Sequence, residues 1–397
     1  MNLVFIAPFA YSPKATVSAR MVPIAQALIQ CGHHVSILMP PYDKPGYSGQ
    51  KWSADGIEFE NMRVHTHWPP ALNMASLALQ LTRRTTVLQP DAIHIFKPVG
   101  PGALAMQLLF SFGYHMPILD NDDWEGAGGW LDVNPYPALQ KRYMAWQERW
   151  CLSHAIAVTC ASHVLARRSV ELGCPSKAVT VFPNGPQQTM KKHIDDALQT
   201  RDELRLKFGW NDKRVLIYTG TVPLNHDLDI AVHAVGSIRY LFPHLRWVII
   251  ASGEGVNSLK GMVAQAGLDD VAEYHEFMPH DQLVERLVAA DIALYPYRDT
   301  NINQAKCAGK VVDYLACGVP SVVSRVGMNT TYIDSDDVGL LTEPGNPVAF
   351  RDALLRLLNA PGEARNIGCA GQQRIWREFG WDNRINELLS IYRSVSP

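Results

Sequence analysis

Short apolar runs alternate with helix-length amphipathic segments along the whole chain of 397 residues. This alternation is typical of βα units, in which helices connect parallel strands and pack on the sheet. In the first half, the expected strands are residues 3–7, 35–39, 92–96, 118–119 with their flanks, 155–159 and 179–182. In the second half, they are residues 215–219, 247–251, 273–277, 292–295, 321–324 and 339–342. The sequence therefore predicts an α/β protein with two parallel sheets.

A polar stretch separates the two halves and begins with Asn-Gly-Pro, a strong turn signal. We predict a first Rossmann-like domain over residues 1–185, a linker over 186–213 and a second Rossmann-like domain over 214–380. Residues 381–397 are expected to form a final helix. This helix could pack on the second domain or fold back onto the first. The two domains are expected to face a central cleft at the carboxyl ends of their sheets, where open parallel sheets bind ligands.

Charge and cysteine usage exclude several classes of protein. The 36 Lys and Arg against 38 Asp and Glu leave a net charge of −2, so no overall basic field is present to hold a nucleic acid. The seven cysteines form no Cys-x-x-Cys pair and no clustered Cys/His spacing, which argues against a disulfide framework or zinc site. The N-terminal apolar run is short and lacks a preceding basic region, so it is expected to be a strand rather than an export signal. We expect a soluble, cytoplasmic protein.

Basic residues occur in four pairs, at positions 83–84, 141–142, 167–168 and 191–192. If these pairs share a face, they could bind anionic lipid weakly at the inner membrane face. Their scatter along the chain favours an ordinary solvated surface.

The densest polar motif runs from Asp299 to Asp313, after an expected strand. Lys306 and Lys310 are four residues apart, so on a helix they share a face. A loop that enters a helix N-terminus attracts anions, and two lysines beside it would strengthen a diphosphate site. Asp313 and Asn303 would then hold hydroxyls of a sugar or ribose. The alternative is a solvated lysine face with an ordinary acidic partner, and spacing alone does not decide between them.

A second polar cluster, with three aspartates and a glutamate between Asp120 and Glu125, directly follows another expected strand. Such a cluster invites a metal site, because hard cations prefer carboxylates. Asp122 or Asp123 could also accept hydrogen bonds from a ligand. A third possibility is a helix N-cap.

Seven short motifs follow one another in order: Gly32-His-His-Val35, Asp91-Ala-Ile-His-Ile95, Phe182-Pro-Asn184-Gly185, Tyr218-Thr-Gly220-Thr221, Ser252-Gly253-Glu254-Gly255, Ala290-Asp-Ile-Ala-Leu-Tyr-Pro296 and Asp313-Tyr-Leu-Ala-Cys-Gly318-Val-Pro320. Their succession resembles the GT-B fold glycosyltransferases, and most closely the retaining glycosyltransferase family 4. The resemblance implies an enzyme that transfers a sugar from a nucleotide-diphosphate sugar to a glycan, a lipid-linked acceptor or a small molecule. It also implies that the configuration at the anomeric carbon is retained and that no metal ion takes part. No cofactor is expected, because the nucleotide-sugar is itself a substrate.

The chain departs from the family pattern at several positions. Family members commonly have two glutamates eight positions apart, where this chain has Ala305 and Asp313. The family's Gly-Arg is Gly220-Thr221 here, and a family lysine aligns with His226. Two cations that usually hold the diphosphate are therefore missing. We expect Lys306 and Lys310 to supply that charge, because a diphosphate leaves poorly without a cation beside it.

By this resemblance, the catalytic candidates are Asp122, Asp123 and Lys310. Related enzymes often carry a histidine that faces the sugar at this strand end, and Asp122 or Asp123 takes its place here. The resemblance implies that one of them binds a donor hydroxyl or stabilises positive charge at the anomeric carbon. The donor-binding candidates are Gly220, Thr221, His226, Gly253, Glu254, Phe277, Met278, Asp299, Asn303, Lys306, Lys310 and Asp313. The acceptor or phosphate candidates are Lys14, Ser18 and Arg20 in the first βα loop, with Trp124 and Trp130 as stacking platforms. For the loop residues, His226 and the aromatic residues, capping, surface charge or half-buried packing stays open as the ordinary alternative.

Two other functions fit the same fold. A nucleotide-sugar epimerase or hydrolase would convert the donor with no acceptor present. A non-catalytic member would bind a sugar nucleotide without releasing it, which the missing glutamate, arginine and lysine positions suggest.

Overall fold

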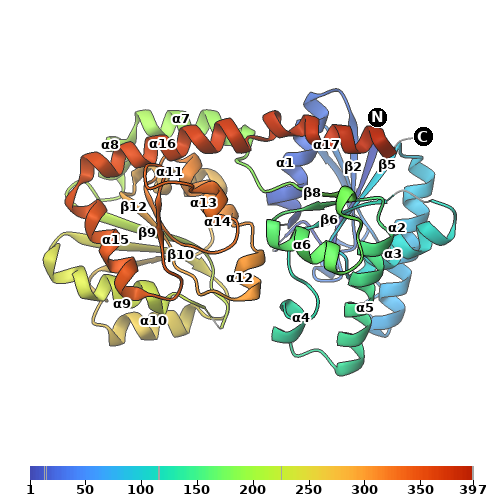
Figure 1. The fold of residues 1–397 in the computed structure, drawn as a ribbon, viewed down its shortest axis with the longest axis horizontal. Coiled ribbons are helices and arrows are strands. Elements are labelled where there is room, and N and C mark those ends of the chain that lie inside the picture. The colour runs from blue at the N-terminus through green and yellow to red at the C-terminus, as the bar shows by residue number, and fades with distance from the viewer. Residues whose placement is uncertain (13, 15, 115–116, 225, 396–397) are drawn as a thin grey trace. The chain divides into compact units, whose positions relative to one another are not determined.

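The computed structural model describes residues 1–12, 14, 16–114, 117–224 and 226–395 (Figure 1). The chain divides into two compact units. Unit 1 contains Met1–Asn184, the short segment Ala305–Cys307 and the chain from Trp381 onward. Unit 2 contains Gly185–Gln304 and Ala308–Gly380.

Unit 1 is built on an eight-stranded sheet in the order β3-β4-β2-β1-β5-β6-β7-β8. The strands are β1 (Asn2–Ile6), β2 (His34–Met39), β3 (Lys51–Ala54), β4 (Ile57–Asn61), β5 (Ala92–Phe96), β6 (Pro117–Asn121), β7 (Ala157–Cys160) and β8 (Val179–Val181). The pair β3–β4 is antiparallel, and the other pairs described are parallel. The chain leaves β1 toward β2 and later returns to β5 on the other side, so the connections diverge at the carboxyl ends of β1 and β5.

The helices of unit 1 are a π-helix, η1 (Thr16–Met21), and α1 (Val22–Gln30), α2 (Pro70–Leu88), α3 (Gly100–Ser111), α4 (Trp130–Val133), α5 (Ala138–His154), α6 (His163–Glu171) and α17 (Trp381–Val395), with 3-10 turns at Pro45–Tyr47 and Ser176–Ala178. Strands β5 and β6 are buried at every residue, and this includes the polar side chains of His94, Asp120 and Asn121. The final helix, α17, shares one apolar core with β1, β2 and α1 (Figure 1). Residues 396 and 397 of the expected final helix lie outside the described residues.

Unit 2 is built on a six-stranded sheet in the order β11-β10-β9-β12-β13-β14, and all its described pairs are parallel. The strands are β9 (Arg214–Thr221), β10 (Leu245–Ser252), β11 (Ala272–His275), β12 (Ile292–Tyr295), β13 (Ser321–Ser324) and β14 (Leu340–Thr342). The chain runs from β9 to β10 and β11 on one side, and then crosses to β12 on the other. The connections therefore diverge at the carboxyl ends of β9 and β12.

The helices of unit 2 are α7 (Lys191–Gln199), α8 (Arg201–Lys207), α9 (Asp229–Ile238), α10 (Val256–Gln265), α11 (His280–Ala289), α12 (Asn301–Ala305, with its last residue in unit 1), α13 (Gly309–Ala316), α14 (Asn329–Tyr332), α15 (Pro347–Asn359) and α16 (Pro361–Phe379), with 3-10 turns at Gln188–Met190 and Arg239–Leu241. Among the described residues, no helix has the length and apolar character needed to cross a membrane.

The segment 186–213, expected as a linker, is a folded part of unit 2. Helices α7 and α8 within it pack on α11. The guanidinium of Arg205 is buried and donates to the carbonyl oxygens of Ala289, at 2.7 Å, and Trp210, at 2.7 Å. The polar pairs Lys191-Lys192 and Asp195-Asp196, which made this stretch read as a linker, are exposed on α7. The apolar residues Ile194, Ala197 and Leu204 of the two helices are buried.

Candidate functional site

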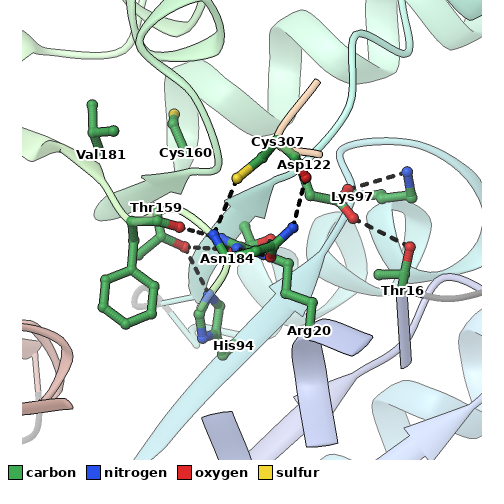
Figure 2. A network of polar contacts seen from close by, with 12 residues as sticks. Thr16, Arg20, His94, Lys97, Asp122, Thr159, Cys160, Val181, Asn184 and Cys307 are labelled. Atoms are coloured by element: carbon green, nitrogen blue, oxygen red, sulfur yellow. Dashed lines mark hydrogen bonds and ion pairs between the residues drawn. The ribbon is translucent and has the colours of Figure 1, made fainter. Parts of the chain in front are cut away.

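One lysine and three carboxylates meet at the carboxyl ends of β5 and β6 in unit 1. Lys97 follows β5 and is 5% exposed. Its Nζ lies 3.1 Å from Oδ1 of Asp122, 2.5 Å from Oδ2 of Asp123 and 2.6 Å from Oε1 of Glu125. Thr16, at the start of η1, donates through Oγ1 to Oδ2 of Asp122 at 3.2 Å (Figure 2). The cluster therefore joins the loops that follow β1, β5 and β6, where the connections of the sheet diverge.

The charges in this cluster depend on one another. Burial alone would lower the pKa of Lys97, but the three carboxylates raise it well above the ordinary value, so the amine stays protonated. Burial raises the pKa of Asp123, and Asp122 and Glu125 raise it further against the opposing effect of Lys97. The side chain of Asp123 is 32% exposed and that of Asp122 is 10% exposed. Asp123 is therefore the more accessible of the two carboxylates proposed as catalytic.

Arg20 belongs to a second, buried network of unit 1. Its Nε and Nη2 donate to the two oxygens of Asp120, both at 2.7 Å. Nη2 also donates to the carbonyl oxygen of Phe182 at 2.9 Å, and Nη1 to Oδ1 of Asn184 at 2.9 Å. The structure thus corrects the prediction for Arg20. A residue that is 2% exposed and bonded through each guanidinium nitrogen is not available to a phosphate or an acceptor.

The histidine of the Asp-x-x-His motif extends this network. His94 pairs through Nδ1 with the hydroxyl of Tyr392 in α17 at 2.8 Å, and through Nε2 with Oγ1 of Thr159 at 3.2 Å. Thr159 in turn donates to Oδ2 of Asp120 at 2.6 Å. Burial lowers the pKa of His94 to about 3, so the ring is neutral. The motif therefore joins the final helix to the sheet.

The predicted stacking platforms are partly covered. The guanidinium of Arg168 lies 4.4 Å from the ring centroid of Trp124, and Trp124 Nε1 donates to the carbonyl oxygen of Ala127 at 2.7 Å. Trp130 is half-buried at the start of α4, with Nζ of Lys306 at 6.0 Å from its ring centroid.

The two other candidates of the first βα loop, Lys14 and Ser18, differ in their exposure to solvent. Lys14 is exposed, and its Nζ lies 4.5 Å from the ring centroid of Phe9. Ser18 is half-buried within η1.

The helix expected to carry both lysines is interrupted, which corrects the prediction that Lys306 and Lys310 share a helical face. Helix α12 ends at Ala305 and α13 begins at Gly309, so Lys306 lies between the two helices. Hydrogen bonds from Asn184 explain the break. The backbone N–H of Asn184 donates to Sγ of Cys307 at 3.1 Å, and its side-chain Nδ2 to the carbonyl oxygen of Cys307 at 2.9 Å (Figure 2).

Lys310 and Asp313 remain together on α13. Their Nζ and Oδ2 are 3.5 Å apart, and the lysine side chain is 39% exposed. His280, at the start of α11, brings Nε2 to 3.7 Å from Oδ1 of Asp313. Burial by itself would raise the pKa of Asp313, but Lys310 and His280 together hold it below the ordinary value. Asp313 is thus an ionised carboxylate with a cation beside it.

Asn303 lies in a polar network that fastens the loop after β12. It is 7% exposed, and its Nδ2 donates to Oδ2 of Asp227 and to the carbonyl oxygen of Arg298, both at 2.9 Å. Arg298 also binds Asp227 at 3.0 Å and both carboxylate oxygens of Asp229. Asn303, predicted to hold a sugar or ribose hydroxyl, thus already donates through its Nδ2 to two protein acceptors. Sequence reasoning missed Arg298, although its position just past β12 was a signal. Nearby, Asp299 accepts a hydrogen bond from Gln304 at 2.6 Å.

Two loops approach closely at the carboxyl ends of β9 and β10. Gly253 has φ +113°, and a Cβ there would lie 2.6 Å from the carbonyl oxygen of Val222. The N–H of Gly255 donates to that same oxygen at 2.9 Å. Only glycine fits this turn. Gly220, at the end of β9, is half-buried, and Thr221 and Glu254 are exposed at this edge.

The remaining donor candidates lie at the same edge of unit 2. His226 accepts a hydrogen bond at Nδ1 from the N–H of Leu228 at 3.3 Å, and burial lowers its pKa. Its Nε2 is buried without a partner among the described residues. Phe277 is 83% exposed just past β11, and Met278 is half-buried. No group of three or more His, Cys, Asp or Glu in the described part of the chain is arranged to hold a metal ion.

Two family models match the chain. The model of glycosyl transferases group 1 matches residues 181–374, and that of the glycosyl transferase 4-like domain matches residues 16–185. Together the two models span residues 16–374, and the chain belongs to the glycosyltransferases that they describe. The resemblance to family 4 drawn from the short motifs is confirmed.

Individual relatives are more distant. A D-inositol 3-phosphate glycosyltransferase of Acidothermus cellulolyticus is 29% identical over 240 residues, which cover 58% of this chain and 51% of that protein. The chain thus spans about half the length of the curated relatives it matches.

Solved structures match over nearly the whole chain. A sucrose-phosphate synthase from Thermosynechococcus elongatus is 16% identical, with a TM-score of 0.77 over 99% of this chain and 98% of that one. The Anabaena protein HepE in complex with UDP and glucose is 14% identical, with a TM-score of 0.75 over 98% of this chain and 99% of that one. These likenesses confirm the predicted fold class, an α/β fold with the two Rossmann-like domains of GT-B glycosyltransferases.

Proposed function

We propose that this chain transfers a sugar from a nucleotide-diphosphate sugar to a hydroxyl group of an acceptor. The observation that carries the proposal is the position of the candidate residues. In each unit they gather at the carboxyl ends of the parallel strands where the connections diverge, which is where open α/β sheets bind their ligands. Membership of the glycosyltransferase family supports the reaction class.

Unit 2 is proposed to hold the donor. The backbone near Gly220 and Thr221, and the glycine turn at Gly253, offer close approach to a nucleotide. Lys310 is proposed to stabilise the departing diphosphate, because a cation fixed where negative charge develops lowers the barrier to departure. The ionised carboxylate of Asp313 is proposed to accept hydrogen bonds from sugar or ribose hydroxyls.

Lys306 stays a proposed second cation, although it does not share a helix with Lys310. UDP-glucose is the first donor to test, because HepE, which has the same fold, binds UDP and glucose.

Unit 1 is proposed to bind the acceptor. Asp123, the more exposed of the two aspartates after β6, is proposed to steady positive charge at the anomeric carbon. Retention of configuration and independence from metal ions are further parts of the proposal. A polyol is the first acceptor to test, because a relative acts on D-inositol 3-phosphate, as its name states.

The test measures release of nucleoside diphosphate and formation of glycosylated product from a panel of nucleotide-sugars, with and without polyol, glycan and lipid-linked acceptors. Acceptor-dependent release together with a product of the added mass supports the proposal. Conversion of the donor without acceptor would indicate an epimerase or hydrolase. Binding without any turnover would indicate a non-catalytic member of the family. This is the second candidate function, because Thr221 and His226 replace two cations that family members usually have.

A further inference from the structure

Lys97 stands among the acidic side chains of the proposed site in unit 1, and none of the motifs above includes it. Its ammonium contacts three carboxylates within 3.1 Å while the residue is 5% exposed. Its backbone has φ +70°, in the left-handed region that a long side chain adopts at a cost. Its N–H still donates to the carbonyl oxygen of Asp120 at 2.9 Å, so the strand pairing with β6 continues through this residue. An unfavourable backbone kept at a buried charge suggests a role in the site.

The ammonium fixes where the two aspartates lie. Asp122 is held from two sides, by Lys97 at 3.1 Å and by the Thr16 hydroxyl at 3.2 Å. Asp123 contacts Lys97 at 2.5 Å and keeps 32% of its side chain exposed. Glu125 occupies a third side of the ammonium at 2.6 Å. Three carboxylates this close together would repel one another without a cation between them.

We propose that Lys97 is a positioning residue of the active site, which holds the Asp122 and Asp123 carboxylates in the geometry that the transferred sugar meets. The proposal rests on the proposed function, because Asp123 is the group assigned to the anomeric carbon. Lys97 acts through these aspartates and does not itself contact the substrate. A lysine suits this position because its compact charge reaches three acceptors that converge from different directions.

The charged groups that face Lys97 determine how the cluster titrates. Asp122, Asp123 and Glu125 follow β6, and the Tyr42 hydroxyl, from the loop after β2, lies close enough to interact with both Lys97 and Glu125. With Lys97 neutralised, Asp123 would lose its cation and keep the like charges of Asp122 and Glu125, while the more distant Arg20 would still interact with Asp122. The affinity of Asp123 for a proton would then rise, and activity that needs its ionised form would be lost at a higher pH.

The experiment compares Lys97→Met, Lys97→Arg and Glu125→Gln with a control, Lys51→Met. Lys51 pairs with Glu60 at 2.9 Å on edge strand β3, and its side chain is 61% exposed. The first readout needs no activity. It follows the titration of the Asp123 carboxyl by ¹³C NMR in protein labelled at aspartate, with the signal assigned from Asp123→Asn. The second readout is kcat and its pH profile for the donor and acceptor pair that the test of the proposed function identifies. The third is the affinity for UDP by calorimetry.

For Lys97→Met we expect the Asp123 titration to move up by about one pH unit or more. We expect kcat to fall about 100-fold, as for a displaced catalytic group, with the acidic limb of its pH profile moved up and the UDP affinity unchanged. Lys97→Arg is expected to keep the Asp123 titration and most of the turnover. The Lys51 variant is expected to match the wild type in all three readouts.

An unchanged Asp123 titration in Lys97→Met would overturn the proposal, as would a loss of kcat without a shift of the pH profile. If Lys97→Met does not fold, Glu125→Gln decides. Removing the like charge of Glu125 should lower the pKa of Asp123, and an unchanged pKa would contradict the proposed coupling. If wild-type protein turns over no donor, the proposed function fails, while the titration still reports whether Lys97 controls Asp123.

Discussion

The guanidinium of Arg20 and the carboxylate of Asp120 meet edge to edge in unit 1, through two hydrogen bonds of 2.7 Å. Neither residue is more than 2% exposed. This parallel geometry satisfies both carboxylate oxygens, and the carbonyl oxygen of Phe182 and Oδ1 of Asn184 take up further donors of the arginine. Together these contacts compensate two charges that would otherwise be costly to bury.

Replacing Asp120 with asparagine should destabilise unit 1 strongly, because the arginine would keep a buried charge without its counter-ion. Removal of one partner of a buried pair costs about 3–5 kcal/mol. The free energy of unfolding in urea measures this loss. The control is Lys51→Ala, which breaks a pair on an exposed side chain and should cost less than about 1 kcal/mol. Equal losses in the two variants would show that the buried pair is not specially sensitive.

Stability should fall as the pH falls below 6.5, because of His94. Its pKa is about 3 in the folded protein, where the ring is buried, against about 6.5 when unfolded. Between these values the unfolded chain binds a proton that the folded chain does not, so stability decreases by about 1.4 kcal/mol per pH unit.

The variant His94→Gln tests this, because it removes the titrating ring. Its free energy of unfolding should depend less steeply on pH between 4.5 and 6.5 than that of the wild type. His163→Gln is the matched control, because that histidine is exposed on α6. An unchanged slope in His94→Gln would show that other groups cause the acid sensitivity.

Sequence reasoning located most of the sheet strands because their signals are local. Buried parallel strands such as β1 and β12 read as short apolar runs whatever surrounds them. The hairpin of β3 and β4 was missed, because only alternate residues of β4 are fully buried and β3 is mostly exposed. A signal was nevertheless present. Asp55-Gly56, with φ of 51° and 78°, is the two-residue turn that favours such hairpins.

The site could be predicted only in part, because partners far apart in sequence decide it. Arg20 reads as a loop cation, but its counter-ion lies 100 residues away. The break before Lys306 depends on Asn184, 123 residues from Cys307. The segment around Lys306 carries no proline that would have announced the break. Lys97 was missed for a related reason, since its importance comes from three carboxylates on another loop.

Replacing Gly253 with alanine should distort the turn beside β9. The new Cβ would lie 2.6 Å from the carbonyl oxygen of Val222, at a backbone φ of +113°. We expect a loss of about 1–3 kcal/mol in the stability of unit 2 and weaker binding of UDP. Gly236→Ala is the control, since a Cβ in that helix meets nothing within 4 Å and should stabilise by about 0.5–1 kcal/mol. Undiminished stability and UDP affinity in Gly253→Ala would refute the assigned close approach.

Replacing Lys310 with alanine should weaken UDP binding about tenfold, which corresponds to about 1.4 kcal/mol. The expected effect is moderate because the lysine side chain is 39% exposed and solvent screens its charge. The same change removes the cation that helps to lower the pKa of Asp313, so the affinity for UDP-glucose should decline at a higher pH than in the wild type. Calorimetry with UDP and UDP-glucose between pH 4.5 and 7.5 measures both effects. Lys207→Ala, which removes an exposed lysine paired with Glu285 on another helix, should change neither. Wild-type affinity and pH dependence in Lys310→Ala would remove this lysine from the donor site and leave Asp313 to bind a neutral part of the nucleotide-sugar.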